Sequence, residues 1–201
     1  MDFIDSTEAL ETLYGTPAEA AKIKVAHRLT PAYRAWIGHS RFCLLSTVGP
    51  EGTDCSPRGD DGPVVRPLDE ATLALPDWRG NQRLDSLRNI VRDPRVSLTF
   101  LVPRSDTVVR VNGMARVTAD AGLRARFDRQ GRQPGTVIVI TLTEIYFQCA
   151  RALKRSGLWS AGAAPEGLPS PGDILHEQSG GSFDGATYDA DWPGRAAKTL
   201  W

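Results

Sequence analysis

The stretch CSPRGDDGP (55–63) contains the arginine best placed to bind an anionic ligand. It sets Arg58 between Ser-Pro and Gly-Asp, close behind the hydroxyl of Ser56. A guanidinium forms paired, charge-assisted hydrogen bonds with a phosphate or a carboxylate. Two other interpretations are open: a plain surface loop, and an adhesion tripeptide formed by Arg58, Gly59 and Asp60. The density of breaker residues predicts that the preceding strand ends before Arg58.

A second basic stretch, LPDWRGNQRLDSLRN (75–89), lies between a predicted strand and a predicted helix. Asn81 stands just before the helix, and Arg83 and Leu84 fall in its first turn. The start of a helix offers free N–H groups and partial positive charge, which suits a phosphate. A capped loop with Asp85 or Asn81 as N-cap explains the stretch equally well.

Other chemical motifs are missing from the sequence. It contains no G-x-S-x-G elbow, no G-x-G-x-x-G, no phosphate-binding Walker loop and no C-x-x-C. The three histidines have no ligand spacing, so we expect no metal site. The three cysteines are far apart, and Cys55 is either a redox thiol or a small apolar filler. No residue is therefore assigned a catalytic role.

Composition and charge narrow the class of protein further. The formal net charge is zero, which argues against a nucleic-acid binder. Twenty of the 24 basic residues are arginine, which suits a small anionic ligand but is also what a GC-rich genome produces. The N-terminus has no signal-peptide pattern and no apolar run is long enough for a membrane span, so we expect a cytoplasmic protein. That location weakens the adhesion interpretation of Arg58-Gly59-Asp60.

The elements that must position these residues are mainly strands. Apolar runs and alternation predict strands at 41–48, 53–57, 71–76, 95–102, 107–118 and 135–150. Gly113 is expected to mark a bulge or a close backbone approach. Irregularly spaced strands with few helices between them predict an α+β, mostly β domain built on an antiparallel barrel.

Helical signals flank and interrupt these strands. Helical spacing predicts helices over 83–93 and 120–131, the second ending at a C-cap glycine. Asp5 with Glu8, and Thr16 with Glu19, form capping-box pairs, and Thr30-Pro31 starts another helix. Ser170, followed by Pro171 and Asp173, starts a short helix, and residues 184–201 are expected to be helical. We predict a single domain over 1–201, with N-terminal helices (1–40), a barrel (41–160) and a tail with short helices (161–201).

Three segments in this order resemble the pyridoxamine 5'-phosphate oxidase-like family of flavin mononucleotide (FMN) proteins. They are FCLLSTVGPEGTDCSPRGD, LALPDWRGNQRLDSLRNIVRDPRVSLTFLVP and TVVRVNGMARVTAD. The sequence is most similar to an uncharacterised bacterial subgroup with a Ser-Pro-Arg-Gly-Asp loop and a late segment like CARALKRSGLW (149–159). The resemblance implies a six-stranded antiparallel split β-barrel with peripheral helices, and a homodimer with FMN at its interface.

The resemblance also implies a set of FMN-binding residues. Arg58 would bind the phosphate, with Asn81 and Arg83 completing the cradle, and Pro76 and Asp77 would run beside the ring or the ribityl chain. The remaining members of the implied site are Ser56, Gly59, Asp60, Leu75, Leu84, Arg110, Arg155, Ser156 and Trp159, the last three reaching over from the partner subunit. Trp78 is either a flavin-stacking residue or a loop anchor.

The sequence departs from the true oxidase in two places. SPRGDDGPVVRP has no lysine where the oxidase has one, and the oxidase's C-terminal substrate-gripping Arg and His have no counterpart. The resemblance implies an FMN-dependent oxidoreductase. These departures leave its small-molecule substrate or electron donor unknown. The alternative is a non-catalytic protein that binds flavin, haem or deazaflavin, or a redox sensor.

Overall fold

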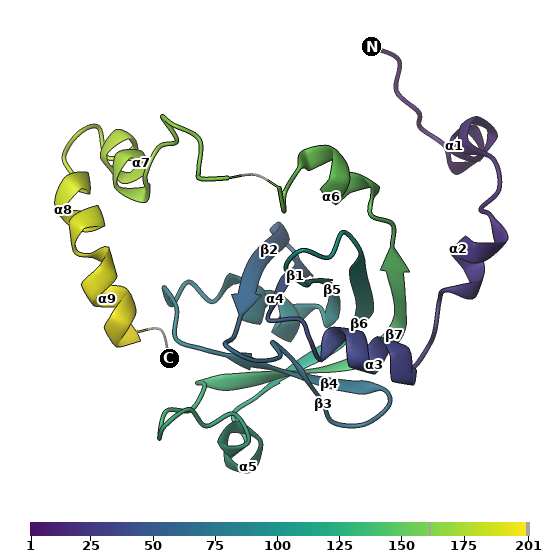
Figure 1. The fold of residues 1–201 in the computed structure, drawn as a ribbon, viewed down its shortest axis with the longest axis horizontal. Helices are drawn as coiled ribbons and strands as arrows, with labels where there is room; N and C mark the ends of the chain where they lie inside the picture. The colour runs from purple at the N-terminus through teal and green to yellow at the C-terminus, as the bar shows by residue number, and fades with distance from the viewer. Residues whose placement is uncertain (161, 200–201) are drawn as a thin grey trace.

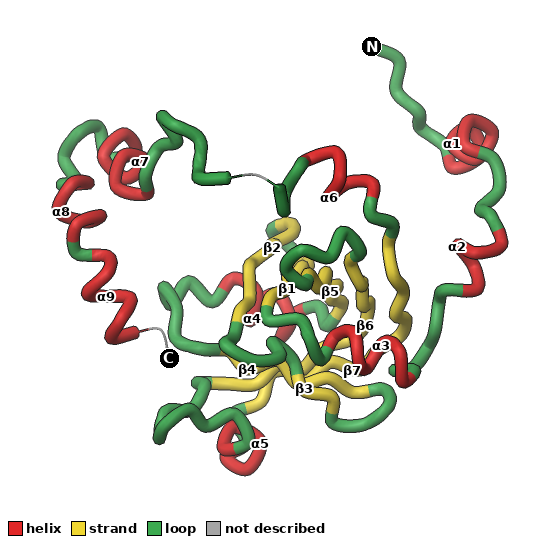
Figure 2. The backbone as a smooth tube through the Cα atoms, viewed as in Figure 1, coloured by secondary structure: helices red, strands yellow, loops and turns green. Residues whose placement is uncertain are grey.

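A computed structural model describes residues 1–160 and 162–199, and its centre is one antiparallel sheet (Figures 1 and 2). The described strands follow the order β2-β1-β5-β6-β7-β4-β3 across the sheet. Their bounds are β1 (Phe42–Gly49), β2 (Gly52–Gly59), β3 (Arg66–Pro67), β4 (Thr72–Asp77), β5 (Arg95–Leu101), β6 (Val108–Thr118) and β7 (Thr136–Gln148). The predicted α+β class, with an antiparallel sheet and peripheral helices, is confirmed.

The prediction of a six-stranded barrel is wrong in its strand count for this chain. Seven strands are present among the described residues, and the sheet is open, with β2 and β3 at its two edges. The additional strand is β3, which pairs only Arg66 and Pro67 with β4. Two paired residues in a proline-containing segment give no alternation to detect, which is why the sequence does not indicate this strand.

Strand β2 is longer than predicted, and it contains Arg58. Pairing with β1 runs through Cys43↔Arg58 to Phe42↔Gly59. An edge strand tolerates a proline such as Pro57, because alternate N–H groups point away from its single neighbour. Arg58 is thus held by a strand and not by a loop.

The helices are short and lie around the sheet. They are α1 (Thr7–Tyr14), α2 (Glu19–Ile23), α3 (Pro31–Ile37), α4 (Asp85–Arg92), α5 (Ala121–Ala125), α6 (Arg151–Ser156), α7 (Pro171–Gln178), α8 (Gly185–Ala190) and α9 (Trp192–Thr199). Thr30 caps α3, and Ser170 with Asp173 forms the capping box of α7, as predicted. The tail helix expected over 184–201 is divided into α8 and α9, and residues 200–201 lie outside the described part.

Three predicted helix boundaries are wrong. Ser6, and not Asp5, caps α1 by accepting from the Ala9 N–H, and α2 follows Ala18 with no side-chain cap from the described residues. Helix α5 ends at Ala125 and does not reach Gly131. Just after the helix, the buried Phe127 packs against Ala74 and Val137.

The core lies along the inward-facing side chains of the strands. Period-2 alternation buries Leu45 on β1, Leu98 and Phe100 on β5, and Val111 on β6. Ile37 of α3 and Ile90 of α4 pack against the same cluster. Burying each such side chain contributes about 1.5–3 kcal/mol, so this cluster fixes the strands that position the polar residues.

Gly113 marks an irregularity in the β6–β7 pairing, as predicted. The register shifts between Asn112 and Gly113. A Cβ atom at Gly113 would lie 2.5 Å from the Thr141 carbonyl oxygen, so the close approach of the two strands requires a glycine.

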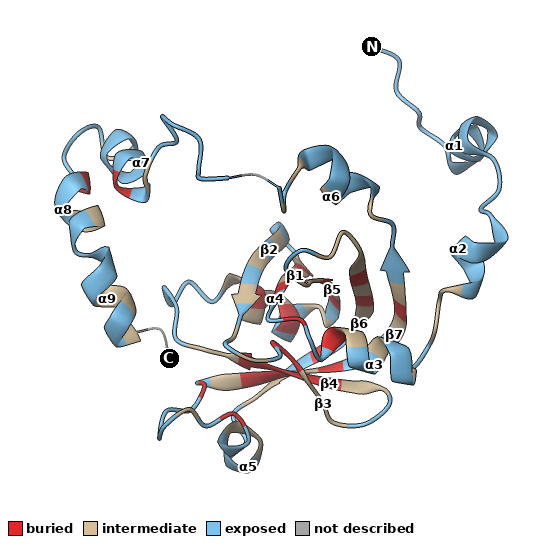
Figure 3. Ribbon diagram, in the orientation of Figure 1, coloured by how far each residue is buried: buried red, intermediate tan, exposed pale blue. Residues whose placement is uncertain are grey.

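Both ends of the chain extend away from the sheet as mostly exposed helical arms (Figure 3). The N-terminal arm contains α1 and α2, and the C-terminal arm contains α7, α8 and α9 (Figure 1). Helices α7 and α8 meet where Gly172 and Gly185 are in backbone contact. Within the described residues, no helix combines the length and apolarity needed to cross a membrane.

Candidate functional site

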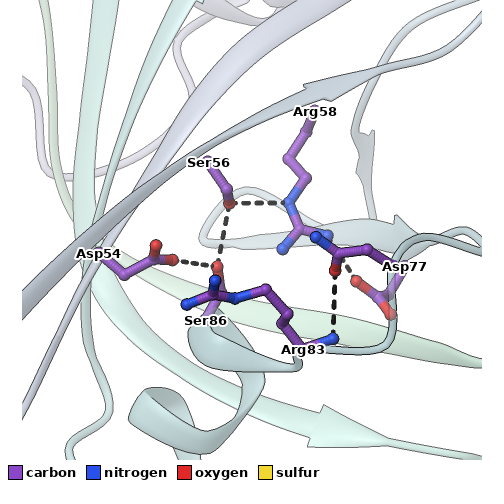
Figure 4. Close-up of polar contacts among 7 residues, drawn as sticks. Asp54, Ser56, Arg58, Asp77, Arg83 and Ser86 are labelled. Atoms are coloured by element: carbon purple, nitrogen blue, oxygen red, sulfur yellow. Dashed lines mark hydrogen bonds and ion pairs between the residues drawn. The ribbon is translucent and has the colours of Figure 1, made fainter. Parts of the chain in front are cut away.

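A cleft of about 1050 Å³ lies between β2 and the first turn of α4. Its walls come from β2, from the 77–87 segment that joins β4 to α4, and from residues near 132–135. The two basic stretches singled out in the sequence therefore form one site. Figure 4 shows the polar side chains that meet there.

Arg58 is held at two of its nitrogens. Its Nη1 lies 2.5 Å from Asp77 Oδ1, and its Nε donates to Ser56 Oγ at 3.2 Å (Figure 4). The Arg58 and Asp77 side chains are only 19% and 18% exposed. Alternation on β2 places Ser56 and Arg58 on the same face, and Asp77 ends β4 across the cleft. The guanidinium is thus fixed before any ligand binds.

A second polar chain continues from Ser56 into α4. Ser56 Oγ lies 3.0 Å from Ser86 Oγ, and Ser86 Oγ donates to Asp54 Oδ2 at 2.5 Å. Neither Ser86 nor Asp54 is predicted from the sequence as a site residue. Alternation on β2 would have placed Asp54 beside Ser56, but only the fold brings the start of α4 against that face.

Arg83 is held differently from Arg58. Its side chain is 73% exposed, and its Nε donates to Asp85 Oδ2 at 2.8 Å. Its backbone N–H donates to Asn81 Oδ1 at 3.1 Å. The flanking residues Gln82 and Leu84 both have φ of 61°, in the left-handed region that non-glycine residues rarely occupy.

The N-cap of α4 is Leu84, so the two predicted caps are wrong, and Arg83 precedes the helix instead of falling in its first turn. Asn81 is engaged in its own turn, and Asp85 is already the first helical residue. Leu84 makes no side-chain capping bond to the described residues. The first-turn residues Asp85, Ser86 and Leu87 line the cleft, and free N–H groups at the start of a helix favour an anion.

Asp60 lies beside the cleft as part of a packed polar cluster. Its side chain is 3% exposed, accepts from Arg129 Nη2 at 2.6 Å and accepts from Trp78 Nε1 at 3.2 Å. Burial raises the pKa of Asp60, but hydrogen bonds involving Asp61, Trp78, Arg129 and the Gly62 N–H lower it by more, so the net shift is downward. Asp60 is not displayed as an adhesion motif requires. Trp78 is anchored by its bond to Asp60 and also lines the cleft.

A smaller cavity of about 560 Å³ adjoins the cleft. Among the predicted residues, Gly59, Asp60, Leu75 and Pro76 line it, and it shares Arg58 with the main cleft. Leu75 and Pro76 are buried. These two residues form apolar wall, while Ser56, Arg58, Asp77, Asn81, Arg83 and Leu84 line the main cleft.

The four remaining predicted site residues lie away from both cavities within this chain. Arg110 on β6 stacks over the Tyr146 ring, 5.4 Å from its centroid. The Trp159 indole N–H donates to the Ser105 carbonyl at 2.7 Å. Arg155 and Ser156 are exposed near the end of α6. Their approach to a second subunit stays a prediction.

The cysteines on the paired strands β1 and β2 differ in their surroundings. Cys43 on β1 is buried, and desolvation raises the pKa of its thiol to about 12, despite the opposing charge of Arg58. Cys55 is exposed, and its sulfur accepts from Ser46 Oγ at 3.4 Å. No group of three or more potential metal-binding side chains occurs in the part of the chain that the structure describes.

Comparison with known proteins places the chain in a family. Residues 29–149, which are more than half of the chain, match the family described as Pyridoxamine 5'-phosphate oxidase. No curated protein matches the sequence.

Solved structures resemble part of the chain. HupZ from Group A Streptococcus is 17% identical, with a TM-score of 0.47 over 58% of this chain and 91% of that one. General Stress Protein 26 from Bacillus anthracis is 18% identical, with a TM-score of 0.44 over 57% and 89%. An FMN-binding protein from Syntrophomonas wolfei is 12% identical, with a TM-score of 0.46 over 71% and 92%.

The family match includes β1 to β7 and the start of α4, and therefore most of the cleft residues described above. The chain belongs to the pyridoxamine 5'-phosphate oxidase family.

Proposed function

We propose that the protein binds FMN in the cleft between β2 and α4, and that it acts as an oxidoreductase on a small molecule. The observation that carries the proposal is Arg58, a half-buried arginine fixed by Ser56 and Asp77 and facing a helix start across the cleft. Family membership supports the same ligand class.

The cleft suits a phosphate-bearing cofactor in size and in charge. A drug-sized ligand needs about 300–1,000 Å³, and the cleft provides about 1050 Å³. Four arginines and three aspartates line it, which leaves one net positive charge: Arg58, Arg79, Arg83 and Arg132 against Asp54, Asp77 and Asp85. The aspartates offset part of the positive charge, so one phosphate group suits the site better than a polyanion.

Different residues would contact the phosphate and the ring of the cofactor. Arg58, Arg83 and the first N–H groups of α4 would hold the phosphate. Trp78, Leu84 and the neighbouring Pro76 would supply apolar contact for the ring. Bound FMN would supply two-electron redox chemistry, while the chain's own residues bind the phosphate, orient the ring and exclude water from it.

We further propose that the functional unit is a homodimer, with Arg110, Arg155, Ser156 and Trp159 of one subunit near the cleft of the other. All four lie outside the cleft of their own chain, so a second subunit would give them a role in the site. Light scattering should give twice the mass of the chain, and a monomer that binds FMN fully would contradict this part.

The experiment is a visible spectrum of the purified protein, followed by FMN titration of wild type and Arg58→Ala. Wild type should show a flavin spectrum or acquire one, and Arg58→Ala should bind FMN at least about 100-fold more weakly, because it loses the charge-assisted bonds to the phosphate. Arg28→Ala, an exposed arginine paired with Glu70 away from the cleft, is the matched control.

Two outcomes would count against the proposal. A colourless wild type that ignores added FMN would contradict flavin binding, and an Arg58→Ala variant that stays yellow would contradict the phosphate anchor. Mixing the loaded protein with NADH or NADPH then tests the redox role. A bound flavin that no donor reduces would indicate a carrier and not an oxidoreductase.

A further inference from the structure

The carboxylate of Asp54 is linked to the guanidinium of Arg58 through two hydroxyls. The links are Arg58 Nε to Ser56 Oγ at 3.2 Å, Ser56 Oγ to Ser86 Oγ at 3.0 Å, and Ser86 Oγ to Asp54 Oδ2 at 2.5 Å (Figure 4). We propose that Asp54 and Ser86 are positioning residues for the anion-binding arginine. This inference rests on the proposed function, because it concerns the phosphate end of the same cleft.

The donor and acceptor of each hydrogen bond in the Arg58–Ser56–Ser86–Asp54 series follow from the two charged groups at its ends. A carboxylate only accepts, so Ser86 donates its single proton to Asp54. Ser86 must then accept from Ser56, which donates its own proton in turn. Ser56 is left as an acceptor toward Arg58, whose Nε–H can only donate. One arrangement of protons satisfies all three bonds.

This arrangement changes the role of Ser56. Its hydroxyl proton points to Ser86 and is not available to a phosphate, so Ser56 orients Arg58 and is not itself a phosphate donor. With Nε held by Ser56 and Nη1 held by Asp77, the guanidinium plane is fixed at two points. Nη2 makes no hydrogen bond to another described residue and is the group left for the ligand.

Burial strengthens the hydrogen bonds in the middle of this series. Ser86 is only 4% exposed, and Asp54 and Ser56 are half-buried. Hydrogen bonds that are shielded from bulk water strengthen one another by polarisation. In this series the polarised hydroxyls of Ser56 and Ser86 lie between the Arg58 guanidinium and the Asp54 carboxylate. The charge of Asp54 therefore contributes to the orientation of Arg58 without touching the ligand.

A simpler role is that the same bonds only fasten β2 to α4. The two roles are separated by comparing FMN with riboflavin, which lacks the phosphate. Loss of the positioning effect weakens the FMN complex alone, whereas a loosened cleft weakens both complexes. A second test is coupling, because residues that act through one chain give effects that do not add.

The experiment measures FMN and riboflavin dissociation constants for wild type, Asp54→Asn, Ser86→Ala and the double variant. Each single variant should bind FMN about tenfold more weakly, and the double variant should be no weaker than either single one. Riboflavin affinity should change by less than about twofold in all three variants, since the lost orientation acts on the phosphate alone. Glu51→Gln, on the same hairpin but paired with Arg92, is the acid-to-amide control and should match wild type.

The results that would overturn the inference differ from those that would overturn FMN binding. Additive losses, equal losses of FMN and riboflavin affinity, or unchanged FMN affinity in Asp54→Asn would each remove the positioning role while FMN binding stands. If wild type binds no flavin, the proposed function fails, and the same variants are titrated with inorganic phosphate. Phosphate binding that depends on Arg58 and falls in Asp54→Asn would keep the inference, and its absence would end it.

Discussion

The two arginines of the cleft are held by different kinds of structure. Arg58 is carried by strand β2, lies 19% exposed and contacts both Asp77 and Ser56. Arg83 is carried by a loop, and its side chain is 73% exposed and hydrogen-bonds only to its near neighbour Asp85 among the described residues. The β2 side is therefore organised before a ligand arrives, whereas the Arg83 side has few contacts to hold it.

Because of this difference, the two sides of the cleft should contribute to ligand binding in different ways. A fixed guanidinium loses little conformational entropy when it binds, so its geometry contributes to affinity and to selection of a phosphate. An exposed arginine contributes mainly long-range attraction, which salt screens. The following predictions test this division.

Asp60 ties the end of β2 to its surroundings, and its replacement should have the largest effect on stability. Asp60→Ala removes the buried carboxylate that accepts from Arg129 Nη2 and Trp78 Nε1, while Asp61 still pairs with Arg129, so the free energy of unfolding should fall by about 2 kcal/mol. Urea denaturation measures this loss. Asp61→Ala is the control, because Asp61 also contacts Arg129 but is 60% exposed, and it should cost less than about 1 kcal/mol.

Lysine substitutions separate geometry from charge at the two arginines. Arg58→Lys keeps the charge but loses the planar group that contacts Ser56 and Asp77 together, so FMN affinity should fall by about tenfold. Arg83→Lys should change the affinity by less than about threefold at physiological salt. Fluorescence titration with FMN measures both, and equal losses would refute the distinction between the strand side and the loop side.

A glycine in the loop should have the smallest effect. Gln82 has a φ of 61°, so Gln82→Gly relieves a strain of about 1 kcal/mol and adds a similar entropy cost in the unfolded chain. The melting temperature should therefore change by no more than about 3 °C. A larger decrease would mean that the Gln82 side chain organises the loop after all.

The sequence predicts the strand side of this molecule better than the loop side. Alternation in the apolar runs locates β1, β5, β6 and β7, and Gly113 marks the bulge, because each signal is local. The short strand β3 and the left-handed Leu84 cap have no local signal, since two paired residues and a strained φ depend on the tertiary fold.

In the candidate site, too, local signals are predictable from the sequence and long-range contacts are not. The sequence identifies Arg58, Asp77, Asn81 and Arg83 from residue type and from resemblance. It does not identify Ser86 as a partner of Asp54, 32 residues away, or Arg129 as a partner of Asp60, 69 residues away. Such pairs form only when the sheet brings distant segments together, so a single sequence contains no pattern for them.

The central claim is that Arg58 anchors the phosphate of FMN while Ser56 and Asp77 hold the guanidinium in place. A crystal structure of the protein with FMN tests it most directly. We predict the phosphate within hydrogen-bonding distance of Arg58 Nη2 and of the first N–H groups of α4, with the Arg58–Ser56 contact kept. A phosphate bound elsewhere, or one that accepts the Ser56 hydroxyl proton in place of Ser86, would contradict the account.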